Sequence, residues 1–149
     1  MKLALQSVRT LEFDSHPANL SQVRDFVRAF LIPLPFARKE RDLMVLGIDE
    51  ACTNIIRHAY HQCTDQMILL GCEHHQEGAL FRLRDFGTQR DPTHHEGRSL
   101  EVLQPGGLGM HLIKRAFDDV EYRLKTHGTE WIATKRFDPA QREHPEAQA

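Results

Sequence analysis

The sequence has few cysteines, few aromatic residues and no large excess of one charge. Its 149 residues include three cysteines (Cys52, Cys63 and Cys72), one tryptophan and a formal net charge of -2. An odd number of cysteines without a CxxC spacing indicates neither a disulfide framework nor a zinc site, so we expect reduced, mostly buried thiols. The balance of 19 basic and 21 acidic residues provides no strong field for a nucleic acid backbone. Nucleic acid is therefore not an expected partner.

Long apolar runs are also absent. The longest, Met67 to Cys72, is far shorter than the roughly 20 residues of a membrane-spanning helix, and Met1 to Ser7 has no continuous apolar core of the secretory kind. We therefore expect a cytoplasmic protein that makes no membrane contact. The ten histidines include the pairs His74-His75 and His94-His95, but these lack metal-ligand spacing. A metal-binding protein is accordingly the most distant of the functions considered.

The hydrophobic pattern predicts one α+β domain over residues 1–137. Apolar residues at helical spacing predict helices over residues 17–30, 38–60 and 108–118. Alternating apolar residues predict strands over residues 3–13, 66–74, 79–86, 120–125 and 130–137, the second and third forming an antiparallel hairpin. This order fits a two-layer sandwich, in which helices cover one face of a mixed or antiparallel sheet. The polar residues 138–149 are expected to form a disordered tail.

A glycine-rich segment, Gln104 to Arg115, opens the third predicted helix. Gly106, Gly107 and Gly109 permit positive φ and close approach of a ligand to the backbone, and the helix start offers free N–H groups to an anion. The segment therefore fits phosphate binding. A tight turn without a ligand is the alternative interpretation.

Two further sets of polar residues suggest a binding site. Glu50, Asn54 and Arg57 lie at i, i+4 and i+7 on one face of the second helix, which could equally be a solvated surface. Asp85 ends an inward-facing apolar row of the third strand, where a carboxylate is costly to bury unless it accepts hydrogen bonds. A charged strand end in solvent is the alternative. The following stretch, Gly87 to Pro105, is long enough to be either functional or a mobile surface loop.

Three ordered motifs resemble those of the GHKL ATPases. Asp49 to Tyr60 is similar to the asparagine box, in the form found in anti-sigma-factor serine kinases. Asp85 to Thr88, followed by Asp91-Pro92, resembles the first glycine box, Gly106 to Leu112 resembles the second, and Gly128-Thr129 resembles the small turn before the last strand. The resemblance extends from about Leu43 to Thr134. It implies a histidine-kinase-like ATPase domain with the Bergerat fold.

The resemblance implies an ATP and Mg²⁺ site. Asn54 would supply a neutral oxygen ligand to Mg²⁺, and Asp85 would accept a hydrogen bond from the adenine amino group, where guanine presents an oxygen. Gly87 would let the base lie against the backbone. Arg57 and Lys114 are candidate phosphate contacts or ordinary surface charges. The implied nucleotide-binding residues are Asn54, Arg57, His58, Asp85, Gly87, Gly106, Gly107, Leu108, Gly109, Met110 and Thr129.

Glu50 distinguishes the two functions that remain. In kinase-type members a glutamate at this place is the general base that accepts the proton of the attacking hydroxyl. The resemblance thus implies a serine/threonine kinase that phosphorylates an anti-sigma-factor antagonist of the STAS type, sequesters a sigma factor and forms a homodimer. The alternative is a non-catalytic ATP- or ADP-binding switch that only holds protein partners.

The sequence departs from the family pattern at Gln89, which stands where the first glycine box usually has a second glycine. This substitution is expected to make the adenine pocket less open. The stretch from Gly87 to Pro105 would form a lid over the phosphates, hinged at Gly97 and at Gly106-Gly107.

Overall fold

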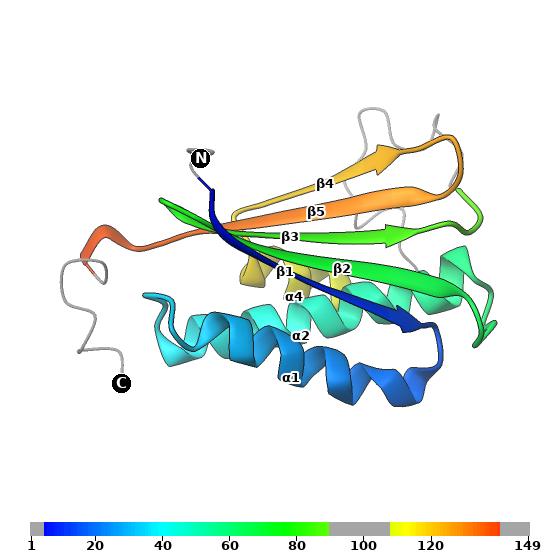
Figure 1. Cartoon of the computed structure of the whole chain (residues 1–149), viewed down its shortest axis with the longest axis horizontal. Helices are drawn as coiled ribbons and strands as arrows, with labels where there is room; N and C mark the ends of the chain where they lie inside the picture. The colour runs from blue at the N-terminus through cyan, green and yellow to red at the C-terminus, as the bar shows by residue number, and fades with distance from the viewer. Residues whose placement is uncertain (1–4, 90–107, 141–149) are drawn as a thin grey trace.

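The computed structural model describes residues 5–89 and 108–140, which form two layers, a five-stranded sheet and helices along one of its faces (Figure 1). The elements, in chain order, are β1 (Leu5–Asp14), the 3₁₀-helix η1 (Pro17–Asn19), α1 (Leu20–Leu31), α2 (Arg38–Asn54), the π-helix η2 (Ile55–Ala59), β2 (Met67–His75), β3 (Gly78–Asp85), α4 (Leu108–Ala116), β4 (Asp119–Leu124) and β5 (Thr129–Arg136). The α+β class and the predicted order of elements are confirmed. The predicted lid from residue 90 onward, the glycines Gly97, Gly106 and Gly107, and residues 141–149 of the tail lie outside the described residues.

The sheet has the strand order β1-β2-β3-β5-β4, and every neighbouring pair is antiparallel. Of the two sheet types that the sequence allowed, the structure therefore has the antiparallel one. In the centre, Leu83 on β3 lies opposite Leu70 on β2 and Trp131 on β5. The register also places Asp85 opposite Thr129, so the end of β3 lies beside the start of β5.

The core lies between the sheet and the helices, with α2 packed between α1 and α4. The apolar stripe of α1 is buried at Val23, Val27 and Phe30, as predicted. On α2 and β3 the most deeply buried positions include Ile48 and Phe81. A fully buried aliphatic or aromatic side chain contributes about 1.5–3 kcal/mol, so this shared core is the main stabilising element of the fold.

The second helix differs from the prediction at its end. Regular α-helix stops at Asn54, and one π-helical turn follows, in which the N–H of Tyr60 donates to the carbonyl of Ile55 at 3.0 Å. His61 and Gln62 then take positive φ values of 49° and 68° and turn the chain away from the helix. Apolar spacing does not distinguish this turn from an α-helical one. Such π turns are rare and occur frequently at functional sites.

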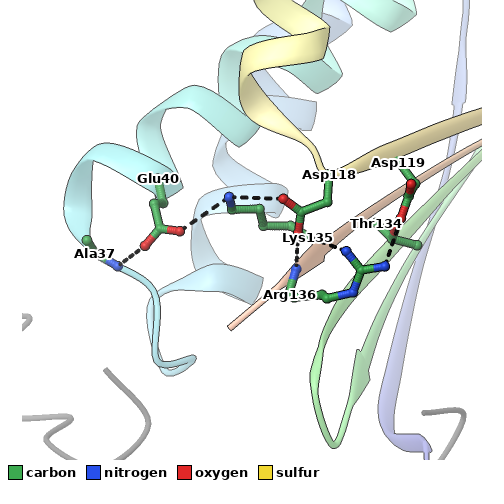
Figure 2. A network of polar contacts seen from close by, with 7 residues as sticks. All are labelled: Ala37, Glu40, Asp118, Asp119, Thr134, Lys135 and Arg136. Atoms are coloured by element: carbon green, nitrogen blue, oxygen red, sulfur yellow. Dashed lines mark hydrogen bonds and ion pairs between the residues drawn. The ribbon is translucent and has the colours of Figure 1, made fainter. Parts of the chain in front are cut away.

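The opposite end of α2 is tied to the sheet by a network of ionic groups (Figure 2). The Glu40 carboxylate accepts the backbone N–H of Ala37 at 3.1 Å and lies 3.5 Å from the Lys135 ammonium group of β5. Lys135 is also 3.5 Å from Asp118, whose carboxylate accepts the backbone N–H of Arg136 at 2.7 Å. Because Ala37 has no side-chain oxygen, only the Glu40 half of a capping box is present.

The structure also shows the state of the cysteines and the groups that could bind metal or cross a membrane. Cys52 and Cys72 are buried and Cys63 is exposed, and all three are free. Burial raises the pKa of the Cys72 thiol to about 12, so it is protonated and unreactive at neutral pH. Within residues 5–89 and 108–140 there is no cluster of three potential metal ligands. Among the helices in these ranges, none has the length and apolar character needed to cross a membrane.

Candidate functional site

A pocket with a cavity volume of about 50 Å³ lies between the end of the α2–η2 helix and the sheet. Its helical wall consists of Ala51, Asn54, Ile55, His58 and Ala59. Its other wall consists of Asp85, Thr88, Tyr122, Thr129 and Trp131. The pocket thus joins residues from the asparagine box, the first glycine box and the turn before β5, which are far apart in the sequence.

Asp85 is the buried acid of the pocket. It ends β3 with only 4% of its surface exposed, and its carboxylate accepts the backbone N–H of Gly87 at 3.0 Å. Burial raises the pKa of Asp85, while hydrogen bonding from the Gly87 backbone, the charge of Arg84 and the Thr129 backbone act in the opposite direction. An ionised carboxylate has room for several hydrogen bonds, so Asp85 can accept a further donor from a ligand.

Two glycines allow the segments around Asp85 to approach one another. A Cβ atom at Gly87 would lie 2.3 Å from the carbonyl oxygen of Ala59 in η2. Gly128 has φ +74°, and a Cβ atom there would lie 2.0 Å from the carbonyl oxygen of Asp85. The close neighbour of Gly87 is therefore the end of the helix, and the glycines of the site are required by backbone packing.

Tyr60 joins the end of the helix to the first glycine box. Its hydroxyl donates to the carbonyl of Met67 at 2.5 Å and accepts the backbone N–H of Phe86 at 2.8 Å. The two neighbours of Tyr60 both contact Thr88. The backbone N–H of Thr88 donates to the carbonyl of Ala59 at 2.9 Å, and the Thr88 hydroxyl lies 3.1 Å from Nε2 of His61. The segment that carries Asp85 is thus fixed directly against η2.

Gln89 has a role that the sequence alone did not reveal. Its side-chain amide donates to the carbonyl of Gly128 at 2.6 Å and also to that of Lys125. Both acceptors belong to the turn between β4 and β5, which positions Thr129. In place of a second glycine, the chain therefore has a side chain that binds the first glycine box to this turn.

Four of the predicted nucleotide-binding residues line the pocket, namely Asn54, His58, Asp85 and Thr129. Glu50 lies one turn before Asn54 on α2, is partly exposed and is not among the lining residues. Arg57 is exposed on η2 and also lies outside the lining.

The structure describes only the second part of the glycine-rich segment, from Leu108 onward. Gly106 and Gly107 lie outside the described residues, and Leu108 and Gly109 are described only as the first residues of α4. Met110 is 1% exposed and packs in the hydrophobic core, whereas Lys114 is exposed on α4. The part of the proposed site that would bind phosphates therefore remains a prediction.

The sequence prediction missed two aromatic residues of the pocket, Tyr122 and Trp131. Trp131 follows Thr129 by two residues, so the alternation of β5 places both side chains on one face of the sheet. This signal was available in the sequence. Tyr122 lies opposite Trp131 on the neighbouring strand β4, and only the strand register could identify it.

The layered fold and this pocket define a GHKL-type ATPase domain. The sequence profile described as the histidine kinase-like ATPase domain matches residues 13–135, and the chain belongs to this family. Membership implies ATP binding.

Its relatives include serine-protein kinases. The serine-protein kinase RsbW of Bacillus cereus (strain AH820) is 29% identical over 94 residues, which cover 58% of each chain. The chain thus spans less than two thirds of the length of this relative. The serine-protein kinase RsbW of Listeria innocua serovar 6a is 25% identical over 120 residues, covering 75% of this chain and 76% of that one.

A solved structure has the same fold. The crystal structure of the RsbU and RsbW domains of Rv1364c from Mycobacterium tuberculosis matches with a TM-score of 0.64 and 16% identity. The match covers 88% of this chain and 32% of the other. The GHKL-type fold expected from the motifs is therefore confirmed.

Proposed function

We propose that this protein is an anti-sigma-type regulatory serine/threonine kinase that uses ATP as its phosphoryl donor. The observation that carries the proposal is the meeting of Asn54 and Asp85 in one pocket, with Glu50 one turn before Asn54 on the same helix. The domain responsible would be residues 1–137, and residues 138–149 would form its tail. The similarity to proteins named serine-protein kinases supports phosphoryl transfer as the reaction.

The described residues of the pocket suit an adenine nucleotide. Asp85 offers a buried acceptor to an amino group, and Tyr122 and Trp131 provide an aromatic wall for a flat base. Asn54 offers an amide oxygen, a hard and neutral ligand that suits Mg²⁺ beside phosphates. When bound, Mg²⁺ would neutralise part of the phosphate charge.

Glu50 is the proposed general base. From its position on α2 it would accept the proton of a serine hydroxyl while that oxygen attacks the terminal phosphorus of ATP. The bond between this phosphorus and the bridging oxygen would break, so that ADP leaves and phosphoserine forms. Asn54 and Asp85 would hold the nucleotide at its two ends, so that the attack occurs from a fixed direction. Arg57, Lys114 and the backbone of Gly106 to Met110 would contact the phosphates.

The proposed partners follow from the family resemblance. The phosphorylated protein would be a STAS-type anti-sigma-factor antagonist, and the unphosphorylated antagonist would compete with a sigma factor for the kinase. We further propose that the kinase is a homodimer in the cytoplasm and that its function is transcription regulation.

Two measurements test nucleotide binding and transfer separately. Mg-ATP should raise the melting temperature of the wild type and not that of Asn54→Ala, because a ligand that binds only the folded state stabilises it. With labelled ATP, the wild type should transfer phosphate to a serine of the antagonist. Glu50→Ala should bind ATP with unchanged affinity and lose transfer by roughly 100-fold or more. Equal thermal shifts for wild type and Asn54→Ala would contradict the magnesium role.

The second candidate function is a non-catalytic switch. It is supported by the position of Glu50, which is not among the residues that line the described pocket. Wild-type protein that binds ATP but transfers no phosphate to any serine of its antagonist would establish this candidate in place of the kinase.

A further inference from the structure

Gln89 makes contacts that the proposed roles of Asn54 and Asp85 leave unused. It is half-buried, and its side-chain amide donates one hydrogen bond to the carbonyl of Gly128 at 2.6 Å and another to the carbonyl of Lys125. The backbone N–H of Lys125 also donates to the carbonyl of Gly128, at 3.1 Å. The amide group of Gln89 thus uses both of its donors on the turn that precedes β5.

The carbonyl of Gly128 belongs to a peptide group that lies against Asp85. The N–H of the same peptide group is that of Thr129, which lies opposite Asp85 in the sheet, and the backbone of Thr129 hydrogen-bonds to the Asp85 carboxylate. The two strands are in close contact here, since a Cβ atom at Gly128 would lie 2.0 Å from the carbonyl oxygen of Asp85. Gln89 therefore holds the oxygen of a peptide group whose N–H serves Asp85.

The Asp85 carboxylate is consequently held from two sides. On its own segment, the backbone N–H of Gly87 donates to it at 3.0 Å. From β5 it is bound by the backbone of Thr129, whose position depends on the turn that Gln89 binds. A carboxylate has about four acceptor sites, so these bonds determine which sites remain free and in which direction they point.

We propose that Gln89 is a positioning residue for base recognition, which fixes the Gly128–Thr129 peptide group and thereby orients the Asp85 carboxylate toward the amino group of adenine. The inference rests on the proposed function, which places an adenine nucleotide in this pocket. Gln89 is not among the residues that line the pocket, so it acts on the ligand through Asp85. A glycine, the usual residue at this place in the first glycine box, has no side chain for this contact. The arrangement is therefore a property of this chain and not of the motif.

The test compares ATP with purine riboside 5′-triphosphate, which has hydrogen in place of the amino group. Titrations by calorimetry in the presence of Mg²⁺ give both affinities, and their ratio measures recognition of the amino group. For the wild type, ATP should bind more tightly by about tenfold or more, because its amino group donates to a charged acceptor. In Gln89→Met, which has a side chain of similar size without a donor, this ratio should fall by about three- to tenfold.

Two further variants serve as controls. Gln89→Lys keeps hydrogen-bond donors at the end of the side chain, so it should restore most of the wild-type ratio. Its charge acts on the triphosphate, which both nucleotides share, and therefore cancels in the ratio. Gln66→Met makes the matched substitution at an exposed glutamine, whose amide donates to the Asp65 carboxylate at 3.0 Å. This variant should bind both nucleotides as the wild type does.

The possible outcomes separate the inference from the proposed function. If the wild type binds neither nucleotide, both are wrong. If it binds the two nucleotides equally, Asp85 does not recognise the amino group, and the inference is refuted while the nucleotide site remains. If Gln89→Met weakens both nucleotides by the same factor, Gln89 only stabilises the loop, which also refutes the inference.

A measurement on the wild type decides the matter even if Gln89→Met does not fold. Hydrogen exchange of the Gln89 side-chain amide, followed by NMR, should be about tenfold slower than that of Gln22, which is exposed on α1. It should slow further when ATP binds and less when the analogue binds, because the hydrogen bonds are linked through one peptide group. Equal rates for the two glutamines, or equal slowing by the two nucleotides, would refute the inference.

Discussion

The two ends of the α2 helix are joined to the sheet by different kinds of interaction. At its start, Glu40, Lys135 and Asp118 form ion pairs between partly exposed groups (Figure 2). At its end, where the pocket lies, neutral hydrogen bonds from Tyr60 and Gln89 and glycines in close backbone contact connect the segments. The chain thus uses charge at one end and backbone geometry at the other.

This difference determines how each end responds to a substitution. Lys135 lies 3.5 Å from both Glu40 and Asp118, so the loss of one carboxylate leaves it a partner. The N–H of Phe86, by contrast, is bound by the hydroxyl of Tyr60, and Gly128 has no room for any side chain. We therefore expect single substitutions to be tolerated at the start of α2 and to be damaging at the pocket.

The largest effect is expected for Gly128→Ala. A non-glycine residue at φ +74° is strained by about 1–2 kcal/mol, and the new methyl group would also overlap the carbonyl of Asp85. We expect a loss of roughly 3 kcal/mol in the free energy of unfolding, measured by urea denaturation, together with loss of ATP binding. The matched control is Gly71→Ala, where the nearest atom, Cβ of Arg82, is at 3.8 Å. Similar losses in both variants would show that the pocket end is not special.

A smaller effect is expected for Tyr60→Phe. The variant removes one hydroxyl and leaves the partly buried N–H of Phe86 without its acceptor, at a cost of about 1–2 kcal/mol. Because Asp85 and Gly87 lie next to Phe86, the affinity for ATP should decrease as well. Urea denaturation and calorimetric titration measure the two effects. Unchanged ATP affinity in a destabilised variant would mean that Tyr60 stabilises the fold without positioning the pocket.

A pH-dependent effect distinguishes the buried acid of the pocket. Because burial raises the pKa of Asp85 above the ordinary value of 3.8, the folded state holds this proton more tightly than the unfolded state. Its contribution to stability is complete below 3.8 and decreases as pH rises through the raised pKa. Relative to Asp85→Asn, the wild type should therefore lose unfolding free energy as pH increases from 3.8. A difference that stays constant or grows with pH would contradict this assignment.

The smallest effect is expected for Glu40→Gln. Glutamine keeps an oxygen that can accept the N–H of Ala37, and Lys135 keeps its contact with Asp118. The unfolding free energy should change by less than about 1 kcal/mol, and by less still at high salt, which screens the ion pair in the wild type. ATP affinity should be unchanged. A loss as large as that of Tyr60→Phe would remove the contrast between the two ends.

The fold was predictable because it depends on periodicity. The stripe of α1 through Val23, Val27 and Phe30, and the alternation of β3 that ends at Asp85, follow directly from where apolar side chains must be buried. The motifs pointed to Asn54 and Thr129, and both of these residues line the pocket. Periodicity could not identify the π turn after Asn54, because its hydrogen bonds shift by one residue while its apolar residues still face the core.

Contacts between strands and between loops could also not be predicted from the sequence. The pairing of Tyr122 with Trp131 depends on the register of β4 and β5, which no local pattern specifies. The sequence indicated only that Gln89 obstructs the pocket, because its acceptors, the carbonyls of Lys125 and Gly128, lie 36 and 39 residues further along the chain. Both features require knowledge of which segments meet.

The π-helical turn at Ile55–Ala59 has an evolutionary consequence. A π turn contains one residue more than an α turn. Deleting one codon would therefore convert the helix end that forms a wall of the pocket into an ordinary α-helix. A single in-frame deletion within this turn would leave the rest of α2 in phase with the core while rotating His58 and Ala59 away from Thr88. We therefore expect one such genetic step to remove the contribution of His58 and Ala59 to the pocket lining.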